Sequence, residues 1–239
     1  MDWRRAEDYA FAADLDAAGW AWQFLRRCPE YRADHAWFIA TWRALETDYG
    51  TPPTRDYFHW KQDPRAWRTQ AGLAGCSLEA CPGEGDQVLI ECWMGEKWGF
   101  RKFPPDPAED FPPDLTWRHI PIPMLPLAND AFPALAAGQV ALAFDLELPL
   151  GPQLEAARQE LARQRHALTR AGHPPFHPGH AAPRWTLWLR LLDALAAGAE
   201  PETAGQVMNM ADPVAEASAA RRMGCHDYRR ILRLIEQTS

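Results

Sequence analysis

The stretch at residues 19–38 constrains the fold most, because it crowds large rings into a short segment. Its sequence, GWAWQFLRRCPEYRADHAWF, holds three tryptophans, two phenylalanines, a tyrosine and three arginines. On helical spacing, Trp20, Phe24 and Cys28 share one face. Pro29 suits the first turn of a second helix. That helix would carry an apolar seam at steps of four and three residues: Tyr31, His35, Phe38, Trp42 and Leu45. The pattern predicts a helical hairpin closed by aromatic packing.

Three short runs in this region also carry a family resemblance. Asp2-Trp3-Arg4, Gly19–Arg27 and Pro29–Asp34 together resemble the transcriptional regulator-like domain of proteobacterial mobile elements. The run from Val140 to Leu168, with Leu191–Ala199, resembles the second domain of the same group. The resemblance implies an N-terminal domain joined to a domain of helix-turn-helix character. It also implies a role like that of the excision and transfer regulators of integrative and conjugative elements.

Net charge differs along the chain. Residues 1–66 carry 9 basic and 11 acidic side chains, residues 67–150 carry 5 and 12, and residues 151–239 carry 11 and 9. The net charges of these segments are −2, −7 and +2. Nucleic-acid binders usually show a positive surface, because neutralising phosphates dominates their affinity. The acidic balance therefore counts against strong DNA binding by the isolated chain.

Cysteine content and hydropathy indicate the cellular compartment in which the chain folds. Five cysteines in 239 residues do not indicate a disulfide scaffold, so we expect free thiols and a reducing, cytoplasmic compartment. No apolar run reaches the ~18 residues of a membrane span, and the N-terminus lacks a secretory signal pattern.

The predicted fold class is α+β, in three parts. An N-terminal helical domain covers residues 1–67. A small β-rich middle with a hairpin and a Pro-rich connection covers 68–135, and a strand followed by a helical C-terminal domain covers 136–239. Nine prolines between residues 104 and 133 exclude regular helix there and predict a domain boundary in or beside that span.

Strands and helices in the second half follow from residue spacing. Gln87–Met94 and Lys97–Phe103 are predicted to form the hairpin around a Gly95-Glu96 turn. Gln139–Leu148 alternates apolar and polar residues and predicts a further strand. Helices are expected at about 152–171, 184–197, 201–210, 213–223 and 226–237.

A helix-turn-helix unit is the first candidate site. Ala199–Met210 would support it, Ala211–Pro213 would form the turn, and Val214–Met223 would lie in the major groove. The competing interpretation is an ordinary helical bundle with solvated arginines. If the unit binds DNA, the phosphate contacts would come from the most basic cluster: Arg221, Arg222, Arg229, Arg230 and Arg233.

A protein-binding surface is the second candidate. Trp3, Trp22 and Trp37 lie off the helical seams, so we expect them to be exposed and available to a protein partner. Stacking of nucleic-acid bases on the N-terminal rings is disfavoured, because Trp20, Phe24, Phe38 and Trp42 fit the packed seams. Three acidic side chains of the Pro-rich span are the charged part of the candidate protein surface: Asp106, Glu109 and Asp110.

Metal binding and catalysis have little support in the sequence. Cys76, Cys81 and Cys92 lack the paired spacing of zinc ribbons, and His173, His177 and His180 share one loop. The sequence lacks a phosphate-cradling glycine loop, a nucleophile elbow and a metalloprotease pair. We expect no enzyme activity, no metal and no cofactor.

Two function classes remain open at the level of sequence. The resemblance favours a bacterial regulator of mobile-element genes that binds DNA. The segment charges favour an acidic modulator, an anti-activator or an inhibitor of a host nucleic-acid-binding system, without DNA binding of its own. The expected partner is accordingly DNA or a basic nucleic-acid-binding protein, not a membrane, and a homodimer is possible.

Overall fold

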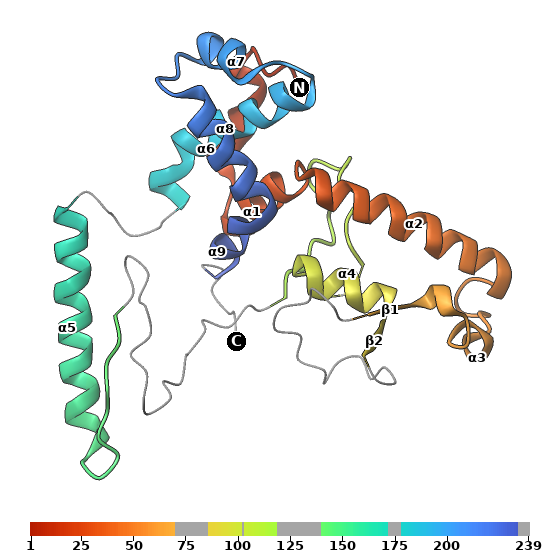
Figure 1. Ribbon diagram of the computed structural model, residues 1–239, viewed down its shortest axis with the longest axis horizontal. Helices are drawn as coiled ribbons and strands as arrows, with labels where there is room; N and C mark the ends of the chain where they lie inside the picture. Colours follow the sequence, from red (N-terminus) through yellow and green to blue (C-terminus); the bar gives the residue numbers. More distant parts are fainter. Residues whose placement is uncertain (70–85, 102, 119–139, 172–177, 234–239) are drawn as a thin grey trace. The chain divides into compact units, whose positions relative to one another are not determined.

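The computed structural model describes residues 1–69, 86–101, 103–118, 140–171 and 178–233 (Figure 1). These residues are mostly helical, and their one sheet is a two-stranded antiparallel ladder. The expected α+β class is therefore corrected toward a helical protein in the part of the chain that is described. None of the described helices is long and apolar enough to cross a membrane.

The described elements are long and short helices with two three-residue strands. In chain order they are η1 (Ala6–Asp14), α1 (Ala17–Leu25), α2 (Pro29–Tyr49), α3 (Tyr57–Trp60), η2 (Pro64–Ala66), β1 (Trp67–Thr69), β2 (Gln87–Leu89), α4 (Ile90–Trp98), α5 (Leu150–Arg170), α6 (Pro178–Ala196), α7 (Pro201–Met208), α8 (Pro213–Arg222), the π-helical turn η4 (Met223–Asp227) and α9 (Tyr228–Leu232).

The chain divides into two compact units. One unit comprises Met1–Pro121 and Ala181–Ser239, so residues from both ends of the sequence share it. The other comprises Ile122–His180 and contains α5. No observation tests the domain boundaries expected near residues 67 and 135, and they stay predictions.

Helix α1 lies at the centre of the first unit. Asp16 caps its N-terminus by accepting a hydrogen bond from the Gly19 backbone N–H at 2.7 Å. Six consecutive side chains, from Trp20 to Leu25, are buried, so the helix is covered on every side. It packs against α9 and η4, and Phe24 meets the rings of Trp185 and Trp188 on α6.

Helix α2 confirms the predicted second half of the hairpin. Pro29 occupies its first turn, and Gly50 ends it with a φ of 82°. Within the predicted seam, Trp42 is half-buried and the other four side chains are buried: Tyr31, His35, Phe38 and Leu45. A disulfide between Cys28 and Cys225 joins the start of α2 to η4, with a Cα–Cα distance of 5.3 Å. The expectation of free thiols is wrong for this pair and for Cys92, which is also disulfide-bonded.

The predicted hairpin at residues 87–103 is wrong. β2 ends at Leu89 and pairs with β1, with Val88 opposite Arg68. The following residues form α4, in which Gly95 is a helical position and not a turn. Four buried side chains of α4 share one helical face, because Trp93 and Met94 lie three and four residues after Ile90 and Trp98 lies four after Met94. Helical packing of these apolar side chains therefore prevails over the β propensity of the segment.

The predicted strand at Gln139–Leu148 is also wrong, and Gln139 itself lies outside the described residues. Residues 140–148 form no strand. The side chain of Leu146 is 84% exposed, so the alternating set does not line a packed face. Instead, the Gln153 side chain bonds the backbone N–H and C=O of Asp145, each at 2.8 Å. The alternation of apolar and polar residues therefore does not produce a strand here, because the segment pairs with no neighbouring strand in the described part of the chain.

Helices α5, α6, α7 and α8 confirm the four corresponding sequence predictions to within a few residues, with the exception that α6 begins six residues early. The last predicted helix, 226–237, is represented by η4 and α9 as far as residue 233. Between residues 103 and 118, the expected lack of regular structure holds apart from the isolated bridge of Phe100 to Trp117. Residues 119–133, with the rest of the proline cluster, lie outside the described residues.

Candidate nucleic-acid interface

Helices α7 and α8, of 8 and 10 residues, are joined by residues 209–212 and pack on each other, at the place expected for the helix-turn-helix unit. Each helix begins with a proline, whose missing N–H suits that position. Asn209 ends α7 in the left-handed conformation, with a φ of 54°. Asp212 caps α8 by accepting a hydrogen bond from the Ala215 backbone N–H at 3.0 Å. The turn is therefore encoded by local residue chemistry.

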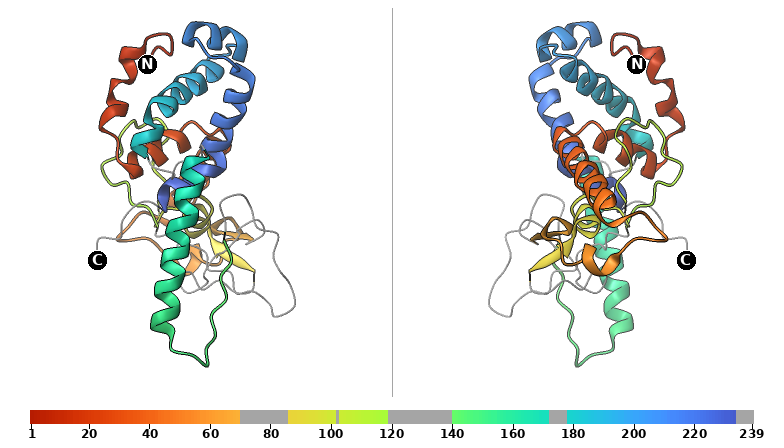
Figure 2. Two further views of the ribbon diagram at one scale, coloured as in Figure 1. Left: turned by 90° about the vertical axis from the view of Figure 1, so that its left-hand side faces the viewer. Right: turned by 90° about the vertical axis from the view of Figure 1, so that its right-hand side faces the viewer.

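The two helices approach each other closely at Gly205. A Cβ atom built at this glycine would lie 2.1 Å from Cγ of Pro213. An apolar cluster joins α6, α7 and α8 to the N-terminal segment, and Figure 2 shows the start of the chain at the same end of the ribbon as α7. Its buried members are Trp3, Leu191, Ala194, Ala204, Met208 and Ala217. The unit thus has a core of its own, closed by a tryptophan from the start of the chain.

Substituting Gly205 by alanine is expected to lower the free energy of unfolding by about 1–3 kcal/mol, because the added methyl group must displace the Pro213 ring. Gly151 in α5 is the matched control, since a Cβ there meets nothing within 4 Å. Gly151→Ala should be neutral or stabilising. Urea unfolding of both variants measures the difference. Equal effects of the two substitutions would contradict the close approach of α7 and α8.

The exposed face of α8 changes from short side chains to arginines along its length. Val214, Ala215 and Ser218 are exposed in its first six residues, and Arg221 and Arg222 are exposed at its end. The acidic side chain of α8, Glu216, is not among these exposed residues.

The one acidic residue in the middle of α8 is held by neighbouring groups. Glu216 accepts hydrogen bonds from Arg184, at 2.8 and 3.1 Å, and from the indole N–H of Trp188. Burial raises the pKa of Glu216, but the Arg184 and Trp188 hydrogen bonds outweigh it and hold the pKa below its ordinary value. Its charge is therefore neutralised locally by Arg184.

The five candidate arginines have different surroundings. Arg221, Arg230 and Arg233 are exposed. Arg222 is also exposed but lies 3.1 Å from the Asp227 carboxylate. Arg229 is half-buried and donates a hydrogen bond to the backbone oxygen of Lys97, so it ties α9 to α4. The structure thus leaves four of the five guanidinium groups at the surface.

Two of the three tryptophans expected at the surface are buried, and that expectation is corrected. Trp3 is 5% exposed and lies in the helix-turn-helix core. Trp22 is fully buried in α1. Trp37 is half-buried, with its ring against Trp93 and under the guanidinium of Arg68 at 4.0 Å.

The acidic candidates lie on a loop that α1 and α2 fasten in place. The indole N–H of Trp22 donates to the Glu109 backbone oxygen at 3.1 Å, and Arg26 pairs with the Asp110 carboxylate. Asp106, Glu109 and Asp110 are exposed, although the pairing with Arg26 neutralises Asp110. Asp106 accepts a hydrogen bond from the Ala108 backbone N–H at 2.8 Å, and among the described residues neither Asp106 nor Glu109 has an ion-pair partner. The loop therefore presents both carboxylates at the surface.

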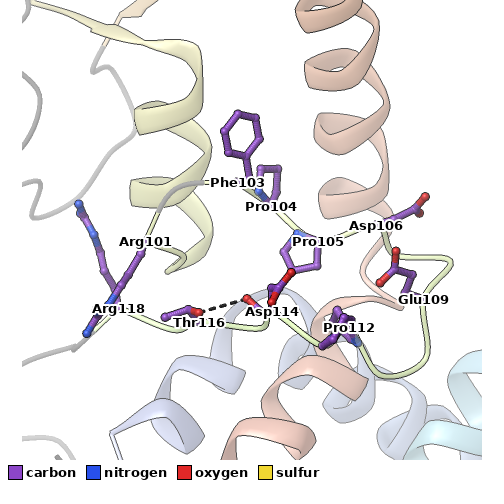
Figure 3. Close-up of a pocket in the computed structure, with 11 residues that line it drawn as sticks. Arg101, Phe103, Pro104, Pro105, Asp106, Glu109, Pro112, Asp114, Thr116 and Arg118 are labelled. Atoms are coloured by element: carbon purple, nitrogen blue, oxygen red, sulfur yellow. Dashed lines mark hydrogen bonds between the residues drawn. The ribbon is translucent and has the colours of Figure 1, made fainter. Parts of the chain in front are cut away.

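The same loop borders a pocket of about 920 Å³ (Figure 3). Arg101 and Arg118 lie at one end, and Asp106 and Glu109 lie toward the other, with proline rings between them. Arg118 is already paired with Glu96. The pocket consequently has both charge signs on its walls and does not indicate one class of charged ligand.

The residues considered for metal binding are largely outside the described part of the chain. Cys76, Cys81, His173 and His177 fall there, and the side chain of His180 is not described. Cys92 lies in α4. The expectation that these residues hold no metal stays a prediction.

Comparison with protein families gives one match. Residues 2–52 match the proteobacterial transcriptional regulator-like domain. This segment comprises η1, α1 and α2, and it includes Trp3, whose side chain completes the core beneath α7 and α8. The match suggests a role in gene regulation. No curated protein and no solved structure shows significant similarity to the chain.

Proposed function

We propose that this protein regulates bacterial gene expression by binding DNA through α7 and α8. The observation that carries the proposal is the closed helix-turn-helix unit, in which α8 turns an exposed face of Val214, Ser218 and two arginines away from the core. The targets we propose are genes of an integrative or conjugative element, the setting that the resemblance of the N-terminal region implies.

The side chains on α8 have the chemistry for a major-groove contact. Val214 is 54% exposed and offers methyl groups that fit the thymine methyl, and Ser218 offers a hydroxyl that can bond either a donor or an acceptor on a base. Small residues in the first turns let the helix approach the bases. Arg221 and Arg222 follow one to two turns later, where guanidinium groups would contact phosphates and set the register.

Acidic side chains around α7 and α8 limit the affinity that we expect for DNA. Glu200, Glu202 and Asp212 are exposed around α7 and the turn. Each unpaired carboxylate near the phosphate backbone is repelled by it, so binding should be moderate and confined to low or physiological salt.

Binding of the full chain to the DNA upstream of its own gene, followed by fluorescence anisotropy over a salt series, tests the proposal. Arg221→Ala with Arg222→Ala should flatten the slope of log K against log salt by about two, since each phosphate contact contributes about one unit. Sequence preference should persist, because bases are contacted elsewhere on α8. Arg163→Ala with Arg170→Ala on α5 removes two exposed charges and should leave the slope unchanged. Equal slopes for all three proteins would contradict a phosphate-binding role for α8.

An acidic modulator without DNA binding is the second candidate, and the fixed Asp106 and Glu109 carboxylates favour it. Their loop is held by Trp22, Arg26 and the hydroxyl of Tyr31, which donates to the Pro105 backbone oxygen at 2.5 Å. A rigid acidic loop can steer a basic protein at low salt. If the wild-type chain binds no DNA at low salt and forms a complex with a basic nucleic-acid-binding protein, the modulator function is favoured.

A further inference from the structure

Helix α5 is amphipathic, yet it has no buried residue along its 21 positions. One apolar stripe runs down it, composed of Leu150, Leu154, Ala157, Leu161 and Leu168. Leu150, Leu154 and Leu161 are 47%, 58% and 46% exposed. Exposing a continuous stripe of leucines is unfavourable, and on a regular helix such a stripe marks a surface for another helix.

The stripe has the period of a coiled coil. Its steps are four, three and four residues from Leu150 to Leu161, and Gln164 and Leu168 continue the same alternation. This 3.5-residue repeat places Leu154, Leu161 and Leu168 at one core position of three successive heptads. Leu150, Ala157 and Gln164 occupy the other. A polar Gln164 in an otherwise apolar seam fixes the register of pairing and reduces its strength.

The two flanks of the stripe carry opposite charges. Arg158 and Arg165 border it on one side, and Glu160, with Gln153, borders it on the other. When two copies pair in parallel, the acidic flank of each meets the basic flank of its partner, and Glu160 faces the partner's Arg165. When they pair antiparallel, the arginine flanks face each other and repel. The charges therefore select one orientation of a self-complementary pair.

We propose that α5 pairs in parallel with α5 of a second copy of this chain. A membrane surface would favour arginines on both flanks of the stripe, and an acidic partner groove would be repelled by Glu160. A second copy satisfies both flanks at once, because it brings an arginine to each glutamate. The pairing goes beyond the proposed DNA binding and does not depend on it. It gives a dimer with two helix-turn-helix units, as repeated half-sites in DNA require.

Sedimentation equilibrium of the full chain tests the apolar seam. The wild-type protein should dimerise, and Leu161→Asp should raise the dimer dissociation constant by at least about 100-fold, since two leucines lose their burial in each dimer. Ala162→Asp is the matched control. It introduces the same charge at an exposed position off the stripe and should leave the dissociation constant within about threefold. A wild-type chain that stays monomeric at about 100 μM, or a dimer that tolerates Leu161→Asp, would overturn the proposal.

Charge reversal tests the orientation. Glu160→Arg and Arg165→Glu should each weaken the dimer about tenfold, because each replaces two attractive pairs by two repulsive ones. The double variant restores both pairs and should return the dissociation constant to within about threefold of wild type. Circular dichroism of each variant monitors helicity, since Glu160 also bonds Arg163 and Gln164 within its own helix. Stronger dimerisation of Arg165→Glu alone would show antiparallel pairing and overturn the parallel arrangement.

Discussion

Replacing Trp22 by alanine is expected to lower the free energy of unfolding by about 3–5 kcal/mol, the range for removing a large side chain from a core. The Trp22 side chain is fully buried, and its ring meets those of Tyr31 and Phe100 edge to face. The substitution also removes the indole N–H that bonds the Glu109 backbone oxygen. The cavity and the lost hydrogen bond act in the same direction.

Urea unfolding of the full chain, followed by circular dichroism, measures this loss. Phe58→Ala is the control, because the Phe58 side chain is 70% exposed and its removal should change stability by no more than about 0.5 kcal/mol. A loss below about 1 kcal/mol for Trp22→Ala would show that α1 is not the centre of the core.

Replacing Asp193 by alanine should cost about 3–5 kcal/mol, because it leaves the buried Arg27 guanidinium without its counter-charge. Arg27 contacts both carboxylate oxygens of Asp193, with Nε–Oδ1 and Nη2–Oδ2 distances of 2.8 and 2.9 Å. The Tyr9 hydroxyl donates to the same carboxylate at 2.6 Å. The Arg27 side chain is only 5% exposed, so water compensates little for the lost carboxylate.

A double-mutant cycle separates the buried charge from the packing. Arg27→Met with Asp193→Leu removes both charges and should be markedly more stable than Asp193→Ala, because apolar replacements of a buried pair are often tolerated. Urea unfolding of Arg27→Met, Asp193→Leu and the double variant gives the coupling. If the double variant lost the sum of the two single effects, Arg27, in the turn between α1 and α2, would not be coupled to Asp193 on α6 as their contact requires.

Helix α1 shows how a correct element can be assigned the wrong environment. Residue spacing predicts the aromatic seam of Trp20 and Phe24, and the same spacing places Trp22 on the solvent side. The sequence AAGWAWQFL has apolar residues around the whole helix, which is the mark of a helix buried on all sides. This composition predicts the burial of Trp22. The burial of Trp3 was not foreseeable, because its neighbours in the core lie near residue 200 of the sequence.

The middle of the chain was predicted less well for two physical reasons. Residues 90–98 combine β-forming side chains with helical spacing, and the spacing of Ile90, Trp93, Met94 and Trp98 was the better guide. Residues 140–148 have the period of a strand, but a strand also needs a partner, and alternation within one segment cannot reveal whether a partner exists.

The helical boundaries near the candidate interface were predicted best, because local signals set them. Pro201, Pro213 and Asp212 fix the starts of α7 and α8 through their own backbone chemistry. The Cys28–Cys225 disulfide is the opposite case, since it joins residues 197 positions apart. Which arginines stay exposed likewise depends on long-range packing, as the contact of Arg229 with the Lys97 backbone shows.

Anisotropy binding of the full wild-type chain to the DNA upstream of its own gene tests the central claim most directly, with a shuffled duplex of equal length and composition beside it. We expect the upstream DNA to bind at least about 1,000-fold more tightly than the shuffled duplex, as specific regulators do. Affinity for both should fall at least about tenfold between about 50 mM and about 200 mM salt. Absence of binding to either duplex at about 50 mM salt would contradict DNA recognition by α7 and α8.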